Sequence, residues 1–89
     1  SMIYQSPISI VETSRNGYQI NIDSGLLKQE NKGKKEVVVV DISSGGTLLR
    51  EVIHGESHAL DLSRLSKGFY AIQVNVGNKT KSKKILIEK

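Results

Sequence analysis

The chain contains no cysteine and no tryptophan, and only four of its 89 residues are aromatic. Without cysteine there is no disulfide framework, and the redox compartment stays open because a cysteine-free domain can occur in any compartment. No apolar run approaches the roughly 20 residues of a membrane-spanning helix, and no signal peptide is recognisable. Ser1 precedes Met2, and we expect Ser1 to be an addition ahead of the natural start. The length predicts a single domain over residues 1–89.

Groups that form catalytic and metal centres are also few. The two histidines, His54 and His58, need further ligands to hold a metal, and Glu51 and Glu56 are the nearby candidates. No serine lies in a Gly-x-Ser-x-Gly elbow. A chain this short has little room for both a β core and a substrate cleft. We therefore predict a protein that is not an enzyme, with no catalytic residues, no metal site and no cofactor.

Positive charge exceeds negative charge, since 13 Lys and Arg residues face 9 Asp and Glu residues for a net charge of +4. One lysine-rich region spans residues 28–35, and the other comprises Lys79, Lys81, Lys83 and Lys84. No aromatic side chains interleave with these lysines to stack bases, so we expect no nucleic-acid partner. Lysine on an edge strand prevents aggregation. Four lysines within six residues exceed that need, so these four are a candidate recognition surface.

The stretch from Leu60 to Val76 predicts a strand, a corner and a second strand. Large apolar side chains alternate with small or polar ones from Tyr70 to Val76, as in a strand with one buried face. Gly68 can adopt a positive φ at no steric cost, which allows a sharp turn. A tyrosine just after such a turn is typical of the tyrosine corner of immunoglobulin-like sandwiches. We predict that Leu65, Gly68 and Tyr70 form this corner; the alternative is that Tyr70 is only a core aromatic.

Similar patterns predict the other strands and the fold class. Four consecutive valines, Val37 to Val40, predict a central strand covered on both faces. Leu26 and Leu27 can extend the second strand, and residues 28–35 form a loop. No segment carries a helical stripe. The predicted strands, at residues 8–12, 18–22, 37–42, 48–53, 59–62, 70–76 and 79–87, indicate an all-β, seven-stranded immunoglobulin-like antiparallel β-sandwich.

The last predicted strand contains a conflict between charge and position. Ile85 and Ile87 share the parity of Lys79, Lys81 and Lys83. A regular strand that buries the isoleucines would aim three lysines at the core, which is costly for unpaired charges. Two solutions stay open. The inward face begins only at Ile85, beyond the edge of the core, or a β-bulge near Ser82 switches the parity.

The second half of the chain resembles the C-terminal sorting domains of the type IX secretion system of Bacteroidetes. Such domains have a strand ending in Asp, a Gly-containing turn, a Leu-x-x-Gly-x-Tyr corner and a terminal Lys followed by aliphatic residues. The matching segments are Val38 to Asp41, Gly45-Gly46, Leu48-Leu49, Leu60 to Leu65, Gly68, Tyr70, Ile72, Val74, Lys84 to Ile87 and Lys89. The resemblance covers roughly residues 37–89. The chain is also similar to small stand-alone secreted Bacteroidetes proteins with an immunoglobulin-like sandwich.

The resemblance implies an exported protein, located in the periplasm, at the outer-membrane surface or outside the cell. Its function is then sorting and anchoring, with the export machinery or a surface protein as partner. The alternative is a stand-alone secreted module that binds a protein or a glycan. Sugar sites commonly use exposed aromatic platforms, and the chain offers only Tyr4, Tyr18 and Phe69 for that role.

Overall fold

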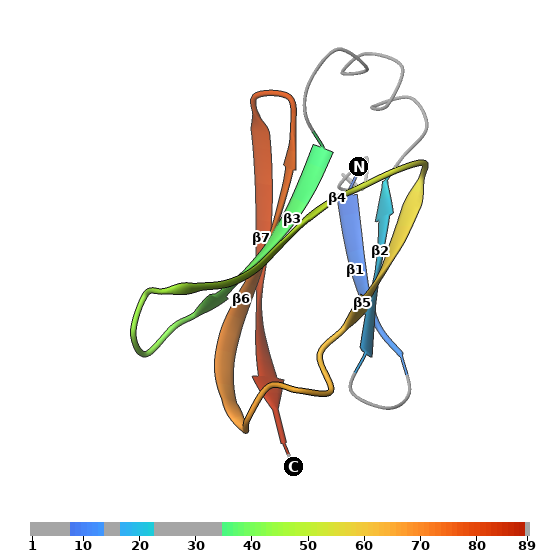
Figure 1. Cartoon of the computed structure of the whole chain (residues 1–89). Helices are drawn as coiled ribbons and strands as arrows, with labels where there is room; N and C mark the ends of the chain where they lie inside the picture. The colour runs from blue at the N-terminus through green and yellow to red at the C-terminus, as the bar shows by residue number, and fades with distance from the viewer. Residues whose placement is uncertain (1–7, 14–16, 23–34, 89) are drawn as a thin grey trace, which may run out of the picture.

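The computed structural model describes residues 8–13, 17–22 and 35–88. They form seven strands in two antiparallel sheets (Figure 1), and no helix occurs among them. This confirms the predicted all-β class, the seven strands and their antiparallel pairing. The strands are β1 Ile8–Glu12, β2 Gly17–Ile22, β3 Lys35–Asp41, β4 Thr47–Val52, β5 Ser57–Asp61, β6 Gly68–Val76 and β7 Lys79–Ile87.

The two sheets divide the strands into three and four. The order is β1-β2-β5 in one sheet and β4-β3-β6-β7 in the other. In Figure 1 the two sheets stand side by side, and β5 leads into β6 across the end where the C-terminus lies. The stretch from Leu60 to Val76 therefore joins the two sheets. The suggested extension at Leu26 and Leu27 and the loop before Lys35 lie outside the described residues.

Strand β3 is the central strand that the run of valines predicts. It pairs with β4 on one side and with β6 on the other. Val37 and Val39 belong to the core cluster, while Val38 is buried on the opposite face, so both faces of the strand are covered. The register of β3 with β4 shifts between Val39 and Val40, which is the sign of a β-bulge.

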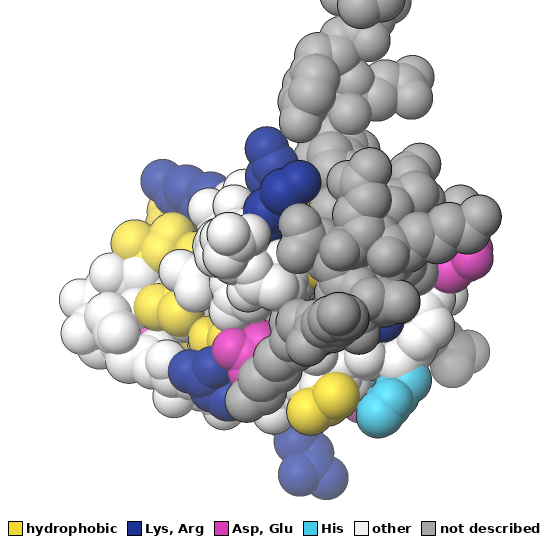
Figure 2. Space-filling model, turned by 90° about the horizontal axis from the view of Figure 1, so that it is seen from above, with side chains coloured by type: hydrophobic (Ala, Val, Ile, Leu, Met, Phe, Trp, Pro, Cys, Tyr) yellow, Lys and Arg dark blue, Asp and Glu magenta, His cyan; other side chains and the backbone are white. Residues whose placement is uncertain are grey.

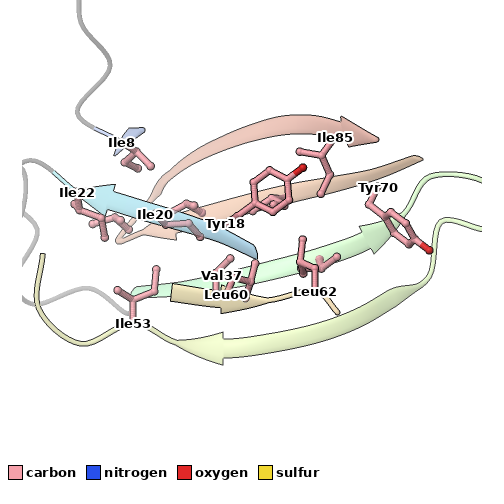
Figure 3. Close-up of a cluster of buried hydrophobic side chains, with 14 of the residues drawn as sticks. Ile8, Tyr18, Ile20, Ile22, Val37, Ile53, Leu60, Leu62, Tyr70 and Ile85 are labelled. Atoms are coloured by element: carbon pink, nitrogen blue, oxygen red, sulfur yellow. The ribbon is translucent and has the colours of Figure 1, made fainter. Parts of the chain in front are cut away.

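The core lies between the sheets and is almost entirely aliphatic (Figure 3). Side chains of one parity from every strand except β4 supply it, as the period of two requires, and Leu49 of β4 packs against it partly buried. Tyr18 and Tyr70 are its two aromatic members. Figure 3 shows Tyr70 at one end of the cluster, with its hydroxyl directed away from the aliphatic side chains. The other members are Ile8, Ile20, Ile22, Val37, Val39, Ile53, Leu60, Leu62, Ile72, Val74, Val76, Ile85 and Ile87.

A line of polar side chains crosses the outer face of the four-stranded sheet. Thr80 Oγ1 donates to Asn75 Oδ1 at 2.8 Å, and Asn75 Nδ2 donates to Glu36 Oε1 at 3.1 Å. Arg50 Nη1 donates to the same Glu36 oxygen at 2.7 Å. The four residues come from β7, β6, β3 and β4 in turn. Two hydrogen bonds thus reach one oxygen, Oε1, of the largely buried Glu36 carboxylate, which offsets part of the cost of burying its charge.

Candidate recognition surface

The corner between β5 and β6 is held by the hydroxyl of Tyr70. This side chain is only 4% exposed, and its Oη donates a hydrogen bond to the Ser66 carbonyl oxygen at 2.7 Å. Such a bond from the start of a strand to backbone a few residues upstream defines a tyrosine corner. Leu65 packs against the core, and its N–H donates to the Leu62 carbonyl at 3.1 Å. The predicted corner residues therefore lie together around one turn.

Gly68 opens strand β6 with a φ of 152°. A Cβ at this position would lie 3.9 Å from Tyr70 Cε2 and 4.0 Å from its hydroxyl. These are ordinary van der Waals distances, so space alone does not demand glycine. The backbone conformation does, because residues with a Cβ rarely adopt it.

Two aspartates fix the turns that flank the corner. Asp61 Oδ1 accepts the Ser63 N–H at 2.9 Å, and chiefly this hydrogen bond holds the pKa of Asp61 below its usual value. Asp41 Oδ1 accepts both the hydroxyl of Ser43 at 2.8 Å and its N–H at 2.9 Å. These bonds, the hydroxyl first, likewise lower the pKa of Asp41. Both are the local side-chain bonds by which Asp initiates turns.

The register of the last hairpin resolves the conflict between charge and position. The β6–β7 pairing runs from Gly68↔Ile87 to Val76↔Lys79 without a shift, so the alternative of a bulge near Ser82 is wrong. Side chains of inward parity become buried only from Ile85 onward. Lys79, Lys81 and Lys83 take inward positions yet are exposed, because no described strand of the facing sheet covers them.

Lys84 lies on the other face of the same strand. Its Nζ is 4.6 Å from the ring centroid of Phe69, which is a cation–π distance. The four lysines of the predicted surface are therefore divided, with three on the inward side of β7 and one on the outer face of the sheet.

Three exposed apolar side chains form a row beside Lys84. Phe69 pairs with Leu86 across β6 and β7, and the Ile42 N–H donates to the Phe69 carbonyl at 3.3 Å. These three residues, here called the outer apolar row, are between 43% and 51% exposed. Figure 2 shows hydrophobic side chains at the surface between Lys and Arg side chains. This row was not predicted from the sequence, although Phe69 and Leu86 fall out of phase with the buried residues beside them.

The two histidines have different surroundings. His54 is exposed, whereas His58 lies within β5 and not in a turn. His58 Nε2 is 2.8 Å from Glu51 Oε1 of β4, so this pair bridges the two sheets. Among the residues that the structure describes, no group of three His, Cys, Asp or Glu side chains is placed to hold a metal ion. Nor does this part of the chain contain a helix with the length and apolar composition needed to cross a membrane.

Comparison with known protein families finds a match over most of the chain. The family model described as secretion system C-terminal sorting domain matches residues 16–88. The match takes in β2 to β7 and extends the resemblance noted at residues 37–89 toward the N-terminus. A comparison with curated proteins finds no match.

Proposed function

We propose, from the premise that this chain belongs to the secretion system C-terminal sorting domain family of type IX secretion, that its β6–β7 hairpin is the surface which the export machinery recognises. The family assignment makes the chain part of an exported protein that interacts with secretion machinery. The observation that carries the proposal is the position of the lysines. They are exposed on both faces of one hairpin whose apolar residues are needed for the core.

Both faces of the hairpin have features suited to a protein partner. The outer face offers the outer apolar row with Lys84 against Phe69, a combination of apolar area and charge found in recognition sites. The inward face offers Lys79, Lys81 and Lys83. A positively charged surface speeds association with an acidic partner and opposes unsuitable ones.

Export of a reporter fused ahead of Ser1 tests the proposal in a host with type IX machinery. The unmodified fusion should be exported, and the variant with Lys81, Lys83 and Lys84 changed to Ala should be exported poorly. Each change should alter the free energy of unfolding by at most about 0.5 kcal/mol, since the side chains are exposed. Arg64→Ala is the matched control, because it removes an exposed positive charge outside the hairpin.

The decisive result concerns the unmodified domain. If the folded fusion remains in the periplasm while a known sorting domain is secreted in the same host, the sorting function is refuted. Full export of the lysine variant would refute the role of the hairpin.

The sandwich is also proposed to be immunoglobulin-like and to have no enzymatic activity. The three-plus-four division of strands, with β4 beside β3, and the tyrosine corner at the start of β6 support the immunoglobulin-like topology. Sorting calls for recognition of a folded surface and not for a reaction. Nuclear magnetic resonance (NMR) structure determination that finds no bond between Tyr70 and Ser66 would remove the main support for the topology.

A further inference from the structure

The bulge in β4 brings two neighbouring leucines to one pocket. In a regular strand Leu48 and Leu49 would point to opposite faces. The register of β3 with β4 shifts between Val39 and Val40, and it passes over Leu48, which is therefore the extra residue of the bulge. Both leucines line the same pocket. Bulges redirect side chains in this way next to functional sites.

The pocket is apolar inside and polar only at its rim. The buried Leu62 and the partly buried Leu65 complete its apolar lining. The exposed Asp61 and Arg64 also line it. Its volume is about 210 Å³, which is below the roughly 300–1,000 Å³ of sites for small molecules. The size and lining suit one large apolar side chain.

Strand β4 is the end strand of its sheet (Figure 1). Within the described ranges it pairs only with β3. The Ile53 N–H donates to the Lys35 carbonyl of β3 at 2.9 Å, and successive residues of an antiparallel strand direct their backbone groups to opposite sides. Arg50 and Val52 therefore direct N–H and C=O to the outer edge of the sheet. This edge continues directly from Leu49 of the pocket.

We propose that β4 accepts an added strand, supplied by an extended segment of a partner protein that places a large apolar side chain in the pocket and a carboxylate opposite Arg50. Pairing with a sheet edge, with alternate side chains held in pockets, is a general mode of peptide recognition. In an antiparallel addition the partner residue opposite Leu49 shares the inward face of that leucine, so its side chain enters the pocket. The partner residue before it lies opposite Arg50 on the outer face.

The charge of Arg50 determines the sign of that outer residue. The Arg50 side chain is 54% exposed, and its Nη1 donates to Glu36. A guanidinium group has several further N–H donors, so a carboxylate on the added strand binds it without displacing Glu36. Opposite charges directly across two strands stabilise the pairing. The rim of the pocket favours neither sign, because Asp61 and Arg64 both line it.

Charge also opposes β4 of a second copy as the occupant. Two copies related by a twofold axis keep the same faces together only if one residue lies opposite itself. Centring on Arg50 or on Glu51 sets like charges directly against each other, which is destabilising. Centring on Leu49 sets Arg50 against the apolar Leu48. The site lies at the opposite edge of the sheet from β7, so it does not depend on the proposed sorting function.

The test uses the complete purified chain and a short capped peptide in which glutamate is followed by leucine, with threonine at the other positions. NMR titration should show saturable shifts of the amides of Arg50 and Val52 and of the Leu65 methyl groups. Alanine in place of the leucine should weaken binding about tenfold, because less apolar area is buried in the pocket. Lysine in place of the glutamate should weaken binding about fivefold, because it sets like charges opposite each other.

A pair of protein variants tests the pocket, and a pair of methylated peptides tests the backbone pairing. Leu48→Gln should weaken binding about fivefold, because the pocket loses apolar area. Leu86→Gln is the matched control with unchanged affinity, since Leu86 is a comparably exposed leucine on β7. N-methylation of the peptide glutamate should abolish binding, because its N–H faces β4, whereas N-methylation of the leucine, whose N–H faces away, should not.

Equal affinities of the two methylated peptides, or of the Leu48 and Leu86 variants, would overturn the proposal. A dimer of the free protein with β4 in its interface would assign the edge to a second copy and overturn it as well. Shifts confined to β7 would show attraction to the lysines alone and would have the same consequence.

Discussion

Removal of one oxygen atom tests the corner that organises the fold. In the variant Tyr70→Phe the ring stays in the core, and the hydrogen bond from Oη to the Ser66 carbonyl at 2.7 Å is lost. We expect the variant to keep the same fold. The change in stability then reports on the corner bond, since the buried aromatic area is unchanged.

The magnitude follows from what each partner does after the change. An intramolecular hydrogen bond contributes about 0.5–1.5 kcal/mol net. A carbonyl left buried and unpaired would cost about 1–3 kcal/mol, but Ser66 is exposed, so water can take the place of the hydroxyl. We therefore expect Tyr70→Phe to lower the free energy of unfolding by about 1 kcal/mol. For a domain of this size that corresponds to a fall in Tm of about 4–8 °C.

Urea unfolding followed by circular dichroism measures the effect, and Tyr18→Phe is its matched control. Tyr18 is also buried, at 5% exposure, but its hydroxyl makes no hydrogen bond among the described residues. Its loss should change the free energy of unfolding by at most about 0.5 kcal/mol. If the two variants unfold at the same urea concentration, the hydrogen bond of the corner contributes nothing specific and the argument for it is refuted.

Three other expectations can be measured on the same domain. Gly68→Ala should lower the free energy of unfolding by about 1–2 kcal/mol, because φ is 152° there; an unchanged thermal midpoint would contradict this. Arg50→Ala should lower it by about 1.5 kcal/mol, because the Glu36 side chain is only 10% exposed and loses its charged partner; Arg50→Lys should restore part of the loss. Asp41 and Asp61 have folded pKa values below the usual 3.8, so the stability they contribute is complete above that pH and is lost as pH falls through the lower folded values. NMR titration of their carboxyl carbons should show both shifts, and changing either residue to Asn should flatten the acid part of the stability curve; pKa values of 3.8 or above would contradict the turns.

The alternation of apolar and polar residues along the chain was sufficient to predict most of the strands of the sandwich. It identified the buried faces of β2 and β6, and the run of valines identified the central position of β3, because burial imposes a period of two on each strand. The corner was also predictable, since Gly68 and Tyr70 stand at the required spacing. These features depend on neighbours along the chain, which sequence displays directly.

Features that depend on cross-strand register were not predictable to the same extent. Whether the lysines of β7 face the core or solvent depends on where the other sheet ends. No pattern within β7 contains that information. The contact from Lys83 to Ile10 joins residues 73 positions apart. The outer apolar row similarly exists only because pairing brings Ile42, Phe69 and Leu86 together.

The polar line across the four-stranded sheet has a consequence for the order of folding. Thr80 and Asn75 are 5 positions apart within one hairpin, and Arg50 and Glu36 are 14 apart within another. The bond from Asn75 to Glu36 spans 39 positions, so it can form only after the chain has closed a long loop at an entropic cost. Such non-local pairing slows folding. The hairpins β3–β4 and β6–β7 can form locally. We expect the long-range pairings, β3 with β6 and β2 with β5, to form later, and the bond from Asn75 to Glu36 to favour the observed alignment of β3 and β6.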